Sequence, residues 1–117
     1  EIIRHLDCRK VPSALYAGHS MGGFLGLMLG ADHPDRITRV VVVDSLPFLP
    51  LISVPTMVMA DEEDQLIPPT NSHFLHNAIP GSRIEMFDGG GHLFMLSKAD
   101  EFAYKLTAFL DEGRVAA

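Results

Sequence analysis

The chain has 117 residues, a length that fits one domain, 1–117, with room for a substantial core. Its composition, 47% hydrophobic and 21% charged, is ordinary for a globular protein. The net charge of −6, with no cluster of Lys and Arg in the sequence, argues against nucleic acid and anionic membrane as partners. The single cysteine, Cys8, excludes a disulfide within the chain, and we expect this thiol to be buried or incidental.

The sequence shows no targeting or membrane-spanning signal. Residues 1–5 are not a basic region leading into a long apolar stretch, so no signal peptide is visible. The longest apolar run, 21–31, is about half of the roughly 20 residues that a membrane span needs. We therefore expect a cytoplasmic protein without a membrane span.

Short apolar runs alternate with helical patterns, which indicates βαβ units and a parallel sheet. The predicted elements are, in chain order, a helix over 1–9, a strand over 13–17, a helix over 21–33, a strand over 37–43, a connection over 45–53, a strand over 54–60, a helix over 70–79, a strand over 83–87 and a helix over 97–112. The sequence thus predicts an α/β fold with about four mainly parallel strands. The connection over 45–53 is short for a parallel crossover.

Two of the predicted helices carry further patterns. Gly22, Gly26 and Gly30 share one face of the helix over 21–33, which would let that helix approach the sheet closely. Ser97 and Asp100 resemble a capping box at the start of the last helix. The buried stripe of that helix is predicted to be Phe102, Leu106, Phe109 and Leu110.

Residues 18–22 read Gly-His-Ser-Met-Gly, a G-x-S-x-G pattern between a predicted strand and a predicted helix. A serine on such a sharp turn is lifted clear of the sheet, so Ser20 is the candidate nucleophile. The turn also aims the N-terminus of the helix at the reacting atom. We therefore expect the Met21 N–H to stabilise an oxyanion.

A serine hydroxyl needs a base, and the base needs an acid to orient it. His92 follows the last predicted strand and Asp64 follows the third. Ser20, Asp64 and His92 each lie past the C-terminal end of a parallel strand, the edge at which sites form in open α/β sheets. These three residues are the predicted catalytic triad.

Several residues are secondary candidates. Asp44 also ends a strand and is an alternative acid, whereas His19 is expected to pack beside the turn. Gly90, in the run 89–91, is a candidate second oxyanion donor, because glycine leaves its N–H unobstructed; the alternative is a turn that only presents His92. His73 and His76 are expected on a solvated helix face, and we predict no metal and no cofactor.

These motifs resemble the α/β-hydrolase superfamily of esterases, lipases and proline-iminopeptidase-like enzymes. Residues 18–23 look like its nucleophile elbow, residues 54–68 like its acid strand and loop, and Gly91-His92 like its histidine loop. The resemblance implies a partial α/β-hydrolase fold without a cap domain. The family fold normally begins with strands and an oxyanion loop upstream of the elbow, and many members insert a lid where this chain has residues 46–53. Asp61 stands where relatives usually have glycine.

The sequence favours a carboxylesterase that cleaves small to medium acyl esters through an acyl-enzyme. Peptidase, lactonase or thioesterase activity would use the same residues. A different hypothesis is a non-catalytic or weakly active binding module, because an upstream oxyanion loop is not seen. The strand over 13–17 has no upstream partner in this chain, so its edge is a template for pairing with a second copy. We therefore expect a homo-oligomer.

Overall fold

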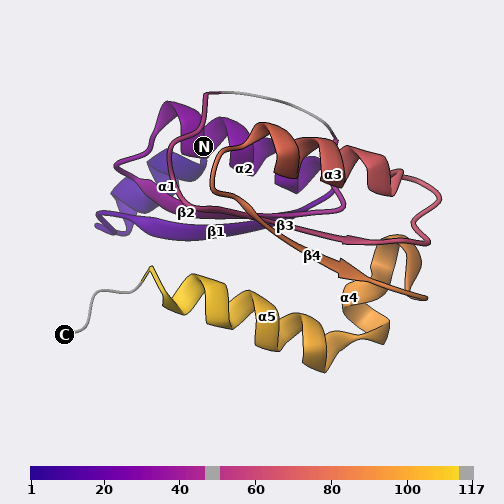
Figure 1. Cartoon of the computed structure of the whole chain (residues 1–117). Coiled ribbons are helices and arrows are strands. Elements are labelled where there is room, and N and C mark those ends of the chain that lie inside the picture. Colours follow the sequence, from indigo (N-terminus) through magenta and orange to yellow (C-terminus); the bar gives the residue numbers. More distant parts are fainter. Residues whose placement is uncertain (47–50, 114–117) are drawn as a thin grey trace.

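The computed structural model describes residues 1–46 and 51–113 and contains a parallel sheet of four strands (Figure 1). The strands are β1 (Ala14–His19), β2 (Ile37–Val43), β3 (Thr56–Asp61) and β4 (Arg83–Phe87), and they lie side by side in that order. The predicted α/β class and the four strands are confirmed.

Helices cover both faces of the sheet (Figure 1). On one face lie α1 (Ile2–Cys8), α2 (Met21–Asp32) and α3 (Pro69–Ala78). On the other face lie α4 (Phe94–Ser97), preceded by the short 3₁₀ helix η1 (Gly91–Leu93), and α5 (Ala99–Asp111). The two layers have separate buried clusters, because successive strand residues point to opposite faces. Val40, Val42 and Val58 pack under α2 and α3, whereas Val41, Val43 and Met59 pack toward α4 and α5.

The glycine face of α2 sits against the sheet, as predicted. A Cβ built on Gly26 would lie 2.6 Å from the Tyr16 ring, and one on Gly30 would lie 2.9 Å from the Val40 side chain. Close contact of this kind fixes the depth of α2 on β1 and β2. It therefore fixes the position of the turn that precedes the helix.

The short connection between the second and third strands does join neighbouring parallel strands. Val40 of β2 is in register with Thr56 of β3, and Val43 with Met59. The connection covers residues 44–55, of which 47–50 lie outside the described residues. Of residues 46–53, the position at which a lid is expected in many family members, the structure describes 46 and 51–53.

Three details differ from the sequence prediction. The predicted capping box is wrong, because α5 begins after Lys98 without a side-chain cap. Ser97 is instead the last residue of α4, and its hydroxyl donates to the carbonyl of Phe94, the first residue of that helix. The break between α4 and α5 was not visible in the sequence because both helices are rich in helix-forming residues. Cys8 was expected to be buried or incidental; it is exposed, which excludes the first of these alternatives. In the predicted stripe of α5, Phe109 is buried and the other three residues are partly buried against the same cluster.

The C-terminal ends of the four parallel strands all lie at one edge of the sheet. The residues that follow or end β1, β2 and β3 there are Ser20, Asp44 and Asp61. In the described sheet β1 pairs with β2 alone, which is the arrangement behind the expected homo-oligomer; the oligomeric state stays a prediction. Among the described residues no helix is long and apolar enough to cross a membrane.

Candidate active site

Ser20 occupies a strained turn between β1 and α2. Its backbone has φ 55° and ψ −118°, a conformation that side-chain-bearing residues rarely adopt. The Ser20 N–H donates to the Val43 carbonyl at 2.8 Å, and the Ser45 hydroxyl donates to the Ser20 carbonyl at 3.0 Å. Gly18 is required because a Cβ there would collide with the Gly22 carbonyl. The backbone of the turn is thus held without help from the Ser20 hydroxyl.

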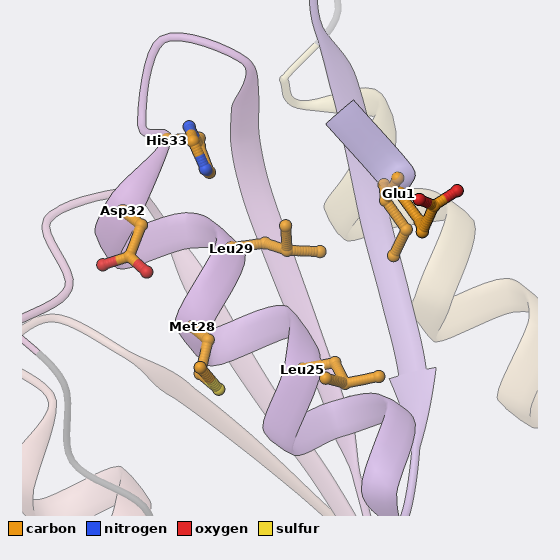
Figure 2. Close-up of a pocket in the computed structure, with 7 residues that line it drawn as sticks. Glu1, Leu25, Met28, Leu29, Asp32 and His33 are labelled. Atoms are coloured by element: carbon orange, nitrogen blue, oxygen red, sulfur yellow. The ribbon is translucent and has the colours of Figure 1, made fainter. Parts of the chain in front are cut away.

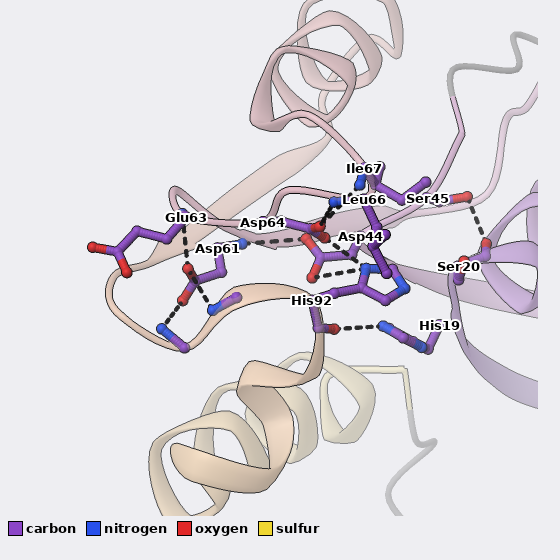
Figure 3. Close-up of polar contacts among 12 residues, drawn as sticks. His19, Ser20, Asp44, Ser45, Asp61, Glu63, Asp64, Leu66, Ile67 and His92 are labelled. Carbon is purple, nitrogen blue, oxygen red and sulfur yellow. Dashed lines mark hydrogen bonds and ion pairs between the residues drawn. The ribbon is translucent and has the colours of Figure 1, made fainter.

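His92 and Asp64 form a short hydrogen bond. His92 Nδ1 lies 2.6 Å from Asp64 Oδ2, and the Asp64 side chain is fully buried (Figure 3). The other oxygen, Oδ1, accepts the N–H groups of Leu66 and Ile67, each at 2.8 Å. Burial alone would raise the pKa of Asp64, but the Ile67 N–H, the His92 ring and the Leu66 N–H hold that pKa below its usual value. Asp64 is therefore ionised, and it accepts a hydrogen bond from His92 Nδ1, which carries the ring proton.

Asp44 is a second buried carboxyl beside this pair. Its side chain is 1% exposed, and Oδ2 lies 4.0 Å from His92 Nδ1 (Figure 3). Oδ1 accepts the Asp61 N–H at 3.2 Å, whereas Oδ2 has no hydrogen-bond donor in the described part of the chain. Burial, and then the charge of the nearby Asp64, raise the pKa of Asp44 to about 8. Asp44 is therefore mostly protonated at neutral pH, and its O–H can donate a hydrogen bond to Asp64.

The raised pKa of Asp44 predicts that the free energy of unfolding depends on pH. The folded chain keeps this proton up to about pH 8, whereas an unfolded aspartate releases it near 3.8. Between these values the folded state binds more protons, so the contribution of Asp44 to the free energy of unfolding falls as pH rises, by up to about 1.4 kcal/mol per pH unit. Above pH 8 the contribution is constant.

The matched variant is Asp44→Asn, which keeps an oxygen for the Asp61 N–H and cannot titrate. Urea unfolding of both proteins at pH 5, 6, 7 and 8 measures the difference between them. We expect the variant to gain stability relative to the wild type with each step in pH. Parallel curves across the range would show that Asp44 has an ordinary pKa.

The loop over 89–91 is held by Asp61, a residue that the sequence analysis noted only as a departure from the family pattern. Asp61 is completely buried and its carboxylate accepts the N–H groups of Gly90 at 2.9 Å and Gly91 at 3.0 Å (Figure 3). The prediction that Gly90 donates to an oxyanion is contradicted, because its N–H is already given to Asp61 Oδ2. The alternative, a turn that presents His92, fits this geometry.

His19, which was expected to pack beside the turn, lies beside His92. Its Nε2 is 2.8 Å from the His92 carbonyl oxygen, and the two rings are 4.4 Å apart between centroids. Since a carbonyl only accepts, His19 Nε2 carries the proton. In the described residues, His19, Asp44 and His92 are the one group whose possible metal-ligand atoms all lie within 4.8 Å of one another.

The remaining histidines lie elsewhere. His5 and His33 are exposed. On α3, His73 is exposed and lies 3.8 Å from a Glu62 oxygen, and the half-buried His76 contacts the Ser82 hydroxyl at 3.0 Å. His73 and His76 thus have separate partners, and the solvated face that was predicted for both holds only for His73.

The geometry around Ser20 leaves one contact open. Among the described residues no hydrogen bond joins the Ser20 hydroxyl to His92; such contacts are often loose in unliganded enzymes. Met21 is the first residue of α2, where backbone N–H groups have no acceptor within the helix. The Met21 N–H therefore lies at a helix N-terminus, and its role at an oxyanion stays a prediction.

Two of the hollows in the described surface differ in their distance from the serine turn. One, of about 220 Å³, adjoins the turn and is lined mainly by apolar side chains: Ala17, Gly18, His19, Val43, Met95, Phe102 and Leu106. The other, of about 300 Å³, lies between the N-terminus and α2 (Figure 2). Its lining comes from the middle and the C-terminal end of α2, which is the end away from Ser20.

Known proteins share this sequence pattern. Residues 4–53 match a family model described as the alpha/beta hydrolase fold. Over 70 residues the chain is 36% identical to a poly(3-hydroxyalkanoate) depolymerase of Ectopseudomonas oleovorans, covering 60% of this chain and 24% of that protein. Over 62 residues it is 37% identical to serine hydrolase BPHL of Mus musculus, covering 53% of this chain and 21% of that protein. The chain thus matches about a quarter of the length of these curated relatives.

A solved structure shows the same fold. The enol-lactonase from Burkholderia xenovorans LB400 superposes with a TM-score of 0.85 at 19% identity, covering 94% of this chain and 70% of that one. The parallel sheet, the strained serine turn and these matches agree with one another. The chain is a member of the α/β-hydrolase superfamily.

Proposed function

We propose that this protein is a serine hydrolase that cleaves small to medium carboxylic esters through an acyl-enzyme at Ser20. The observation that carries the proposal is the 2.6 Å contact between His92 Nδ1 and Asp64 Oδ2. An ionised carboxylate only accepts, so Nδ1 holds the ring proton and Nε2 is left as the basic nitrogen. A neutral imidazole with a free Nε2 is what a serine hydroxyl needs as its general base.

The reaction follows from these roles. Ser20 Oγ attacks the ester carbonyl carbon while its proton moves to His92 Nε2, and Asp64 stabilises the imidazolium that forms. The oxyanion develops at the N-terminus of α2, where the Met21 N–H and the helix dipole favour negative charge. The C–O bond then breaks and His92 gives its proton to the leaving alcohol. Water attacks the acyl-enzyme by the same route, which releases the acid and restores Ser20.

Apolar surface near the turn supports the proposal that the protein recognises its substrate by the acyl group. The hollow of about 220 Å³ includes Gly18 and His19, which immediately precede the nucleophile. Burial of apolar atoms favours binding by about 0.8 kcal/mol for each CH₂. A substrate whose acyl chain reaches this hollow would therefore bind more tightly than acetate esters.

A series of p-nitrophenyl esters with acyl chains of increasing length tests the proposal. We expect turnover above the uncatalysed rate, with kcat/KM rising from acetate toward medium chains and then falling. The name of the mouse relative, a serine hydrolase, is in line with this expectation. If a folded sample hydrolyses none of the esters faster than buffer, the proposed ester hydrolysis is wrong.

A further inference from the structure

One buried carboxylate contacts both loops of the proposed catalytic pair. Asp61, the last residue of β3, is 0% exposed. Its Oδ1 accepts the Glu63 N–H at 2.9 Å and the Gly91 N–H at 3.0 Å, and its Oδ2 accepts the Gly90 N–H at 2.9 Å. The carboxylate oxygens thus accept these three hydrogen bonds from backbone N–H groups. Such charge-assisted hydrogen bonds are stronger than those between neutral groups.

Two of the three donors directly precede the two residues of the proposed catalytic pair. Glu63 directly precedes Asp64, and Gly91 directly precedes His92. Asp61 is also joined to the first loop by its backbone, since its carbonyl accepts the Asp64 N–H at 3.2 Å. A single side chain therefore links the segment that carries the acid to the segment that carries the histidine.

The loop over 89–91 depends on this acceptor for its shape. Gly89 and Gly91 have φ of +82° and +67°, so successive N–H groups turn inward toward one point. A glycine at position 61 would leave both part-buried N–H groups without the carboxylate, and a donor that is shielded from water and unpaired is costly. The link is therefore made by the Asp61 side chain itself.

We propose that Asp61 is a positioning residue that sets the hydrogen bond between His92 and Asp64 by holding both loops. The inference rests on the proposed function, in which that bond orients the general base. The contact is 2.6 Å long, and a displacement of about 1 Å in a catalytic group can cost about a hundredfold in rate. Asp61 itself touches neither substrate nor nucleophile in this scheme.

Two variants and one control test the proposal. Asp61→Asn keeps the shape, but its amide oxygen can accept only two of the three N–H groups, and its NH₂ must face the third donor. Asp61→Gly removes all three acceptors. Glu62→Gln is the control, because Glu62 is a half-exposed neighbour whose Oε1 lies 3.8 Å from His73 Nε2. We expect kcat to fall about tenfold in Asp61→Asn and about a hundredfold in Asp61→Gly, with KM changed less than threefold, and no change in the control.

A second measurement reads the loops without catalysis. In NMR spectra, the His92 Nδ1 proton should be a sharp low-field signal in the wild type and in Glu62→Gln, and should broaden or shift upfield in the Asp61 variants. Hydrogen exchange at Gly90 and Gly91 should accelerate in the same variants. Because these signals need no substrate, they test the link even if the wild type proves inactive on esters, which would overturn only the proposed function.

The proposal is overturned if Asp61→Asn and Asp61→Gly keep wild-type kcat and the wild-type Nδ1 signal. It is also overturned if the variants only lose stability, so that kcat per folded molecule is unchanged. Urea unfolding of each variant provides the folded fraction for that comparison. If Asp61→Gly fails to fold, the Asp61→Asn result decides between the two outcomes.

Discussion

Replacing Ser20 by alanine is expected to reduce ester hydrolysis to near the uncatalysed rate, a loss of roughly four to six orders of magnitude in kcat. The variant removes the proposed nucleophile and nothing else that the structure requires. The strained turn is held by the Ser20 N–H on Val43 and by the Ser45 hydroxyl on the Ser20 carbonyl, and both contacts use backbone atoms of Ser20. The fold should therefore survive.

Steady-state hydrolysis of the best p-nitrophenyl ester, together with urea unfolding, measures both parts of this expectation. Ser13→Ala is a matched control, because Ser13 is exposed and lies just before the other end of β1. We expect full activity in the control. Normal turnover by a well-folded Ser20→Ala protein would remove Ser20 from the mechanism.

Asp64→Asn is expected to lower kcat by about four orders of magnitude, by analogy with the effect of a wrong histidine tautomer in a triad. The asparagine oxygen can keep the N–H groups of Leu66 and Ile67, so the loop stays in place. Its NH₂ then faces His92 Nδ1 and donates to it. The ring proton is driven to Nε2, and the base can no longer accept the Ser20 proton.

Asp44→Asn should cost far less, about tenfold at most, because Asp44 stands 4.0 Å from His92 and is mostly neutral at pH 7. The two variants are compared in the same assay at the same pH. If Asp44→Asn were the more damaging change, the orienting acid would be the residue after β2. The roles given to the two carboxyls would then be exchanged.

The sequence predicted the elements and the edge of the site well because both depend on local patterns. The G-x-S-x-G turn, the apolar strand over 37–43 and the position of His92 after the last strand are all visible within a few residues. Parallel strands then bring Ser20, Asp64 and His92 to one edge without any knowledge of long-range contacts.

The parts that were missed depend on burial and on partners far apart in the chain. Asp61 begins an acidic run over 61–64, yet it is fully buried, and two of its three donors, Gly90 and Gly91, are 29 and 30 positions away. One signal was present: an acid directly follows the apolar residues 57–60 of a strand. The neutral state of Asp44 had no such signal, because it arises from burial beside the charge of Asp64.

Labelling with a fluorophosphonate, followed by mass spectrometry of the peptides, tests most directly whether these residues form a working nucleophile. The reagent reacts with a serine only when a base and an oxyanion site act on it together. We predict one adduct per chain, located on Ser20, absent in Ser20→Ala and formed far more slowly in Asp64→Asn. No adduct in the folded wild type, or an adduct on any other residue, would contradict the proposed triad of Ser20, His92 and Asp64.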